Sequence, residues 1–158
     1  GLDLMPVGGG SLQVTVQTEI DAPADAVFDY IADLSNNPNW QSGVETTMWT
    51  SPPPVAVGST CEQTLDSGTV VEYVVTALLP RRSITIETRR GAVIPTTVTR
   101  TVQVLNEAKS RVRMDLTGHP RGWRRLTAPL VPRAIRGAIG SDYRRLKRVL
   151  EAAQTPEE

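Results

Sequence analysis

The sequence is poor in the residues that most often build catalytic centres and structural metal sites. It contains one cysteine, Cys61, and one histidine, His119. A single cysteine excludes an internal disulfide and any multi-cysteine metal site. One histidine without a cysteine partner is also too few ligands for a typical zinc site. We therefore expect neither a metal nor a cofactor.

Long apolar runs are also missing. The best stretch, residues 70–79, is interrupted by Glu72 and falls short of the roughly 20 residues that a membrane span needs. No Lys or Arg precedes Arg81, so the beginning of the chain lacks the basic segment of a secretory signal. We expect a cytoplasmic protein of one domain. The expected organisation is a flexible leader at 1–11, the domain at 12–153 and a frayed tail at 154–158.

The first forty residues combine a strand pattern with two short helices. Apolar and polar residues alternate over 12–20, which predicts a half-buried strand. Pro23 suits the first turn of a helix. The apolar residues at helical spacing after it are Val27, Phe28, Ile31 and Leu34. Asn37 is expected to cap a second short helix that begins at Pro38 and carries Trp40.

The middle of the chain predicts antiparallel strands without an intervening helix. Their approximate ranges are 44–50, 57–66, 69–79, 83–89, 94–105 and 110–117. The residues expected to face inward are Val71, Tyr73, Val75, Ile84, Ile86, Val98, Val102, Val104, Val112, Met114 and Leu116. Pro129 and Pro132 lead into a long final helix. Its apolar stripe consists of Ile135, Ile139, Tyr143, Leu146 and Leu150.

The net charge of zero hides a separation of signs along the chain. Residues 1–80 carry ten acidic and no basic groups, whereas residues 81–158 carry seventeen basic and seven acidic groups. The halves could neutralise each other within one fold, with the arginines of the final helix facing Asp25, Asp29 and Asp33. Alternatively, those arginines could make a peripheral contact with an anionic partner or membrane surface. We expect no nucleic-acid binding, because the basic segment lacks interleaved aromatic residues.

Residues 14–40, VTVQTEIDAPADAVFDYIADLSNNPNW, resemble the opening of the SRPBCC or START-like superfamily, in its polyketide cyclase/dehydrase and lipid-transport-like branch. The matching residues are Ile20, Ala22, Pro23, Val27, Phe28, Ala32, Asp33, Pro38 and Trp40. The closing residues 145–151, RLKRVLE, also fit, whereas the turn NEAKS at 106–110 departs from the Gly-Gly-Thr of many relatives. The resemblance implies an α+β helix-grip fold: a curved seven-stranded antiparallel sheet wrapped around a long C-terminal helix, with two short helices after the first strand.

The resemblance also implies a cavity for an apolar molecule between the sheet and the final helix. We expect the protein to bind or carry a lipid, a polyketide or another apolar metabolite there. A polyketide cyclase or dehydratase acting in the same cavity is the alternative, but no acid–base pair is visible at the inward positions. The sequence identifies neither the ligand nor the oligomeric state. The expected ligand-binding residues are Gln63, Tyr73, Ile86, Thr88, Val98, Arg100, Val102, Met114, Leu116, Trp123, Leu130, Ile135 and Ile139.

Arg100 is the most informative single residue, because it is in phase with the apolar residues Val98 and Val102. An unpaired guanidinium inside a core is very costly. Four outcomes are open. A bulge turns the side chain outward, it extends to the rim, it pairs with an inward acid, or it binds an anionic group of the ligand.

Three other residues have both a functional and a plain interpretation. His119 is a general acid or base at the cavity mouth, or a loop histidine without a role. Cys61 is a nucleophile, or an inward-facing residue that acts as a small hydrophobe. Trp123 gates the cavity or touches a membrane interface, or it packs beneath its loop.

Overall fold

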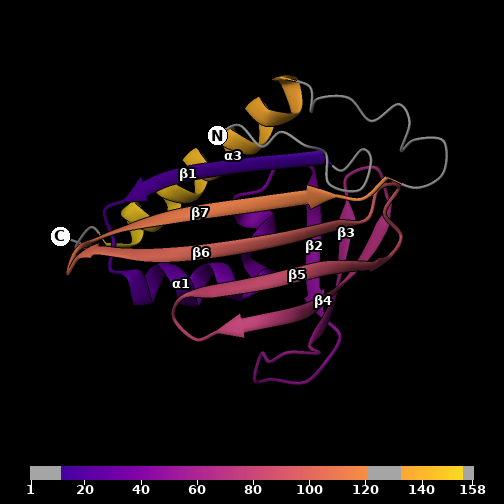
Figure 1. The fold of residues 1–158 in the computed structure, drawn as a ribbon, viewed down its shortest axis with the longest axis horizontal. Helices are drawn as coiled ribbons and strands as arrows, with labels where there is room; N and C mark the ends of the chain where they lie inside the picture. Colours follow the sequence, from indigo (N-terminus) through magenta and orange to yellow (C-terminus); the bar gives the residue numbers. More distant parts are fainter. Residues whose placement is uncertain (1–11, 121–132, 155–158) are drawn as a thin grey trace, which may run out of the picture.

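The structure is a computed structural model that describes residues 12–120 and 133–154. A single sheet, two short helical segments and one long helix make up these residues (Figure 1). The strands are β1 (Leu12–Ile20), β2 (Val44–Trp49), β3 (Thr60–Leu65), β4 (Val70–Leu79), β5 (Ser83–Arg90), β6 (Thr96–Asn106) and β7 (Lys109–Gly118). The helical segments are α1 (Ala24–Ala32), the 3-10 helix η1 (Leu34–Asn39) and α3 (Arg133–Ala153). The expected leader at 1–11 lies outside the described residues.

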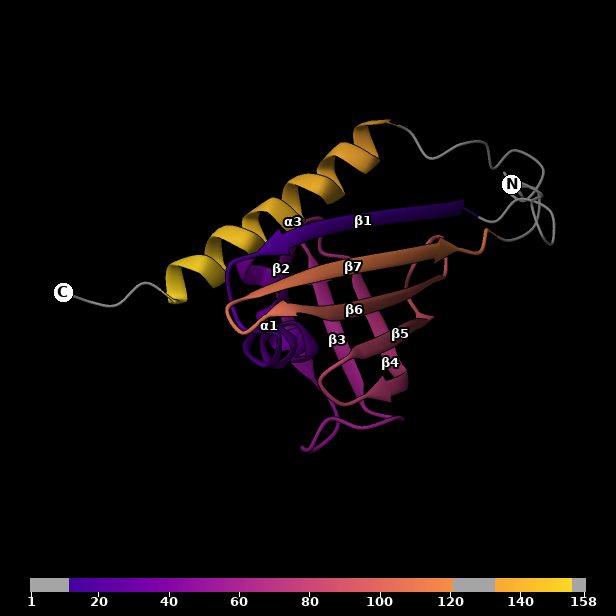
Figure 2. The same cartoon turned by 60° about the vertical axis from the view of Figure 1, so that its left-hand side comes forward.

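The seven strands form one antiparallel sheet in the order β1-β7-β6-β5-β4-β3-β2. Each strand from β2 to β7 lies beside its neighbour in the chain, and β1 pairs with β7 along its whole length. β2 and β3 run across the direction of β1, β7 and β6, so the sheet is strongly curled (Figures 1 and 2). Two register shifts between β4 and β5, at Glu72/Tyr73 and Val75/Ala77, provide local bends. α3 packs on this sheet beside β1. The predicted α+β helix-grip fold is therefore confirmed.

The first helix agrees with the sequence, whereas the second begins earlier than predicted. Val27, Phe28 and Ile31 on α1 are buried, as their spacing indicated. η1 starts at Leu34, and its cap is Asp33, whose carboxylate accepts a hydrogen bond from Ser35 N. Asn37 does not cap a helix. Its side chain turns inward, because the interior offers Gln63 Oε1 as a hydrogen-bond partner at 3.1 Å.

One residue predicted to face inward does not. Val104 is 66% exposed, whereas Val102 on the same strand is buried. β5 pairs with β6 only as far as Ser83 opposite Thr101, so beyond this point β6 is the edge strand of the sheet and pairs with β7 alone. The alternation of Val102 and Val104 is regular, but the core ends between them.

The separated charges meet within the fold. Six ion pairs join acids of residues 1–80 to bases of residues 81–158: Arg81–Asp25, Arg89–Glu72, Arg90–Glu72, Lys109–Glu19, Lys109–Asp21 and Arg111–Glu19. The expectation that arginines of α3 face the acids of α1 is wrong, because Asp25 pairs with Arg81 and Asp33 bonds to Ser35 and Trp49.

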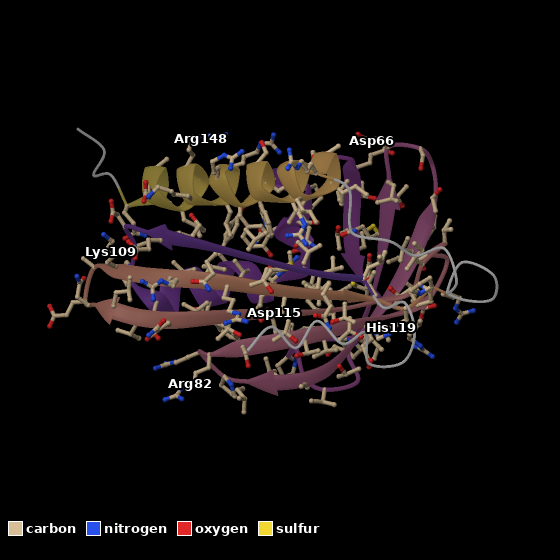
Figure 3. The ribbon with its side chains drawn as sticks, turned by 45° about the horizontal axis from the view of Figure 1, so that its top comes forward. Asp66, Arg82, Lys109, Asp115, His119 and Arg148 are labelled. Carbon is tan, nitrogen blue, oxygen red and sulfur yellow. The ribbon has the colours of Figure 1, made fainter. Side chains whose placement is uncertain are left out.

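The outward face of α3 keeps several arginines apart from the acids of the fold. Among the described residues, Arg133, Arg136, Arg144 and Arg148 are exposed and take part in no ion pair. Figure 3 shows Arg148 on the side of α3 that points away from the sheet. A peripheral contact between this face and an anionic surface stays a prediction. None of the helices seen in 12–120 and 133–154 has the length and apolar character of a membrane span.

Candidate functional site

A pocket of about 260 Å³ lies between the curled sheet and α3. Eight of the residues expected to bind ligand line it: Gln63, Tyr73, Ile86, Val98, Arg100, Met114, Leu116 and Ile139. They come from β3 to β7 and from α3, so every central strand contributes. Six further residues in the described part of the chain also line it: Asn37, Trp40, Gln41, Thr96, Asp142 and Tyr143. The apolar part of the wall comes from Ile86, Val98, Met114 and Leu116 of β5 to β7 and from Ile139 of α3, and the charged groups are Arg100 of β6 and Asp142 of α3.

Three of the expected residues that the structure describes, Thr88, Val102 and Ile135, do not line this pocket. Thr88 lies at its margin and bonds across the strands, with its Oγ1 3.2 Å from Thr96 Oγ1. Val102 is buried in the core instead. Ile135 is 50% exposed, because the first turns of α3 precede its contact with the sheet. Trp123 and Leu130 lie outside the described residues. Whether any of these positions binds a ligand stays a prediction.

Arg100 remains inside the protein. Its residue is 3% exposed, and β6 has no register shift at this position that would turn it outward. Nη1 donates hydrogen bonds to the carbonyl oxygen of Ile31 at 2.9 Å and to Asn37 Oδ1 at 3.2 Å. Cζ lies 5.0 Å from the centroid of the Trp40 ring, within cation–π distance. Two of the four outcomes, outward rotation and extension to the rim, are thereby excluded.

Asn37, the side-chain partner of Arg100, is held in place by further hydrogen bonds. Asn37 Nδ2 donates to Gln63 Oε1 at 3.1 Å, and Thr47 Oγ1 donates to the same oxygen at 3.0 Å. Because Asn37 uses its amino group toward Gln63, its carbonyl oxygen is directed at Arg100. The three polar side chains Asn37, Thr47 and Gln63 are all buried. The sequence reasoning missed Asn37, since its pattern indicated a helix cap.

Two tyrosines add phenol groups to the pocket. Tyr143 is 3% exposed and packs edge-on against Trp40, with 5.0 Å between ring centroids. Burial raises the pKa of Tyr143, and the nearby charge of Arg100 offsets part of that rise. Burial also raises the pKa of Tyr73. Both phenols are therefore protonated and neutral near pH 7.

Asp142 is the pocket's carboxylate among the described lining residues, and its charge is already engaged. Oδ1 accepts hydrogen bonds from Ser42 N at 3.0 Å and from Ser42 Oγ at 2.8 Å. Arg145 Nη1 lies 3.6 Å from the same oxygen. The sequence reasoning did not select this residue, although it is the sole acid between Arg121 and Arg148.

Cys61 takes the plain interpretation that the sequence offered, whereas a role for His119 stays a prediction. Cys61 is 1% exposed, and burial raises the pKa of its thiol to about 11. It is therefore a protonated, small hydrophobic side chain and not an activated nucleophile. His119 is exposed after β7, with Nε2 3.5 Å from Thr97 Oγ1, and it does not line the pocket. The described residues contain no cluster of His, Cys, Asp and Glu that could hold a metal ion.

We expect Cys61 to react slowly with thiol reagents in the folded protein. At pH 8 a pKa of about 11 instead of 9.0 lowers the thiolate fraction roughly 100-fold, and burial slows access further. Reaction with an aromatic disulfide, followed by absorbance, should be at least 100-fold slower in buffer than in 6 M guanidinium at the same pH. Rapid stoichiometric reaction of the folded protein would contradict the buried position.

Comparison with known proteins agrees with this architecture. The family model described as polyketide cyclase/dehydrase and lipid transport matches residues 11–151. No curated protein matches the sequence. Among solved structures, the Bacillus cereus protein XoxI is 14% identical, with a TM-score of 0.72 over 92% of this chain and 99% of its own. A START superfamily protein of Mycobacterium smegmatis is 14% identical, with a TM-score of 0.67 over 89% and 95% of the two chains. The protein DR_A0006 of Deinococcus radiodurans is 18% identical, with a TM-score of 0.65 over 89% and 98%. At these identities the structures show a shared fold.

Proposed function

The chain belongs to the polyketide cyclase/dehydrase and lipid transport family of START-like proteins, and from this premise we propose that it binds or carries a hydrophobic small molecule. The pocket between the sheet and α3 is the observation that carries the proposal. Ile86, Val98, Met114, Leu116 and Ile139 supply its apolar wall. An engineered cavity of about 150 Å³ holds benzene. A pocket of about 260 Å³ therefore has room for a molecule larger than one aromatic ring.

Binding without chemistry is favoured over catalysis by the state of the polar groups. A general base must be within reach of substrate and must carry a suitable pKa. Asp142 is engaged by Ser42 and Arg145, and burial raises the pKa of Tyr143 and of Tyr73. The pocket residues that the structure describes include no histidine.

A cyclase or dehydratase is the second candidate, and one observation favours it. Arg100 and Tyr143 both line the pocket, close enough for the charge of Arg100 to act on the Tyr143 phenol. A guanidinium and a phenol in a site of low dielectric are suited to stabilise an enolate oxygen. Turnover of a linear polyketide mimic, lost in Tyr143→Phe while binding persists, would support this candidate over simple binding.

Filling the pocket from α3 should abolish ligand binding. Ile139 lines the pocket, so Ile139→Trp places a bulky indole where the ligand would lie. Titration with an environment-sensitive apolar dye should give saturable binding to the wild-type protein and at least a tenfold weaker affinity for the variant. Native mass spectrometry of the gently purified protein should show a bound small molecule that the variant lacks.

Ile135→Trp is the matched control for this experiment. It makes the same replacement one turn earlier in α3, at a residue that is 50% exposed and does not line the pocket. Its affinity for the dye should stay within about twofold of wild type. Equal affinities for Ile139→Trp and Ile135→Trp, with both proteins folded, would place the ligand elsewhere.

A further inference from the structure

Arg100 is a buried cation whose described contacts are all neutral. They are the carbonyl oxygen of Ile31, the amide oxygen of Asn37 and the ring of Trp40. None of the ion pairs among the described residues includes Arg100. A buried charge is costly unless an opposite charge accompanies it, and neutral partners supply only part of that compensation.

The hydrogen bonding of this guanidinium is also incomplete. Nε is buried and has no hydrogen-bond partner, although both bonds of Nη1 hold the group firmly in place. Arg100 also lines the pocket, so a guanidinium with an unused donor borders the space that a ligand would occupy. The protein thus holds a positive charge in a fixed orientation at the pocket wall and leaves its anion to come from elsewhere.

The groups around Arg100 leave donors rather than acceptors for a ligand. A guanidinium can only donate, so Arg100 does not use the O–H hydrogen of the neighbouring Tyr143, which is available to another partner. Gln63 Oε1 accepts two hydrogen bonds, which leaves its amino group as the side that can serve the pocket. Asn37 Oδ1 is occupied by Arg100. A ligand group that meets this corner must therefore accept hydrogen bonds.

The acid at the pocket does not satisfy this cation. Asp142 is held by both hydrogen-bonding groups of Ser42, and its neighbouring cation is Arg145. Arg145 in turn donates to the Trp40 carbonyl oxygen at 3.1 Å, which ties the Asp142 pair to the backbone of Trp40. The two charged groups among the described lining residues are therefore separate: Asp142 has the opposite charge of Arg145 beside it, and Arg100 has no such partner.

We infer that the ligand is a hydrophobic acid whose carboxylate binds Arg100, Tyr143 and Gln63 while its apolar body lies against β5 to β7. This inference rests on the proposed function and names the class of molecule for the same pocket. A carboxylate supplies both the missing negative charge and the acceptor oxygens, and bonds between charged groups are about twice as strong as neutral ones. An alcohol of the same shape supplies an acceptor oxygen without the negative charge, and an ammonium group supplies neither.

The test compares two probes of nearly equal shape, 2-naphthoate and its neutral analogue 2-acetylnaphthalene. Naphthyl fluorescence titrations at pH 7.5 give the dissociation constant of each probe for wild-type protein and for variants. The wild-type protein should bind 2-naphthoate at least tenfold more tightly than 2-acetylnaphthalene. In Arg100→Met the affinity for 2-naphthoate should fall tenfold or more, and that for 2-acetylnaphthalene should change less than threefold.

Arg144→Met is the matched control, because it removes the same charge from the exposed face of α3. Its affinity for 2-naphthoate should stay within twofold of wild type. An equal loss in Arg144→Met and Arg100→Met would assign the effect to overall charge and overturn the inference. Arg100→Lys keeps the charge and should retain part of the preference for the acid.

The wild-type protein alone decides the matter even if no Arg100 variant folds. Tight binding of 2-acetylnaphthalene without preference for 2-naphthoate would overturn the acid inference and leave the proposed function intact. Failure of both probes to bind, together with equal dye binding by Ile139→Trp and Ile135→Trp, would overturn the proposed function itself.

Discussion

Replacing Trp40 with alanine should lower the free energy of unfolding by about 3–5 kcal/mol. The Trp40 side chain is fully buried, and it joins three parts of the fold. Its ring packs edge-on against Tyr143 of α3 and lies beneath Arg100 of β6, while its backbone follows η1. Truncation would leave a large cavity and remove the aromatic face from a buried cation. Urea denaturation followed by circular dichroism measures the loss.

Two variants bracket this expectation. Trp40→Phe keeps an aromatic ring, and the indole Nε1 that it removes has no hydrogen-bond partner among the described residues. We therefore expect Trp40→Phe to cost less than about 2 kcal/mol. Met48→Ala, at a side chain that is 64% exposed, should change stability by less than about 0.5 kcal/mol. A loss below about 1 kcal/mol for Trp40→Ala would show that the indole does not hold these elements together.

The strands and their faces could be predicted because both are properties of local sequence. The alternation at 12–20 and at 96–106 fixed which side chains share a face, and Arg100 lies on the face that its phase indicated. How far along each strand and helix the buried core extends could not be predicted from local sequence. It depends on where β5 ends and where α3 first meets the sheet, which is why Val104 and Ile135 are exposed despite regular patterns.

The polar corner of the pocket could be predicted only in part. Arg100 was recognisable as a conflict between charge and phase, but its partners Ile31 and Asn37 lie 69 and 63 residues away in sequence. Asn37 followed by Pro38 is a typical local signal for a helix cap, and nothing nearby indicates an inward amide. Tyr143 fitted the apolar stripe of α3, which describes its ring and leaves its hydroxyl unassigned. Contacts between distant segments decided both residues.

Gly91→Ala should be the other strongly destabilising single replacement, at about 3 kcal/mol. Gly91 has φ +93°, a conformation that costs a residue with a Cβ about 1–2 kcal/mol. A Cβ there would also lie far inside contact distance of the Val70 carbonyl oxygen, at 2.1 Å. The start of β4 or the end of β5 would have to move, and such overpacking typically costs 1–3 kcal/mol. Urea denaturation again gives the change in the free energy of unfolding.

Gly68→Ala separates the cost of the backbone conformation from the cost of the steric clash. Gly68 has a similar φ of +88°, but a Cβ at this position would meet nothing within 4 Å. It should therefore show the backbone cost alone, about 1–2 kcal/mol. The excess in Gly91→Ala then measures how firmly β4 and β5 are held together, and these strands carry Tyr73 and Ile86 of the pocket. Equal losses of unfolding free energy in the two variants would mean that the strands move to accommodate the new methyl group. The pocket wall that they form would then be easily deformed.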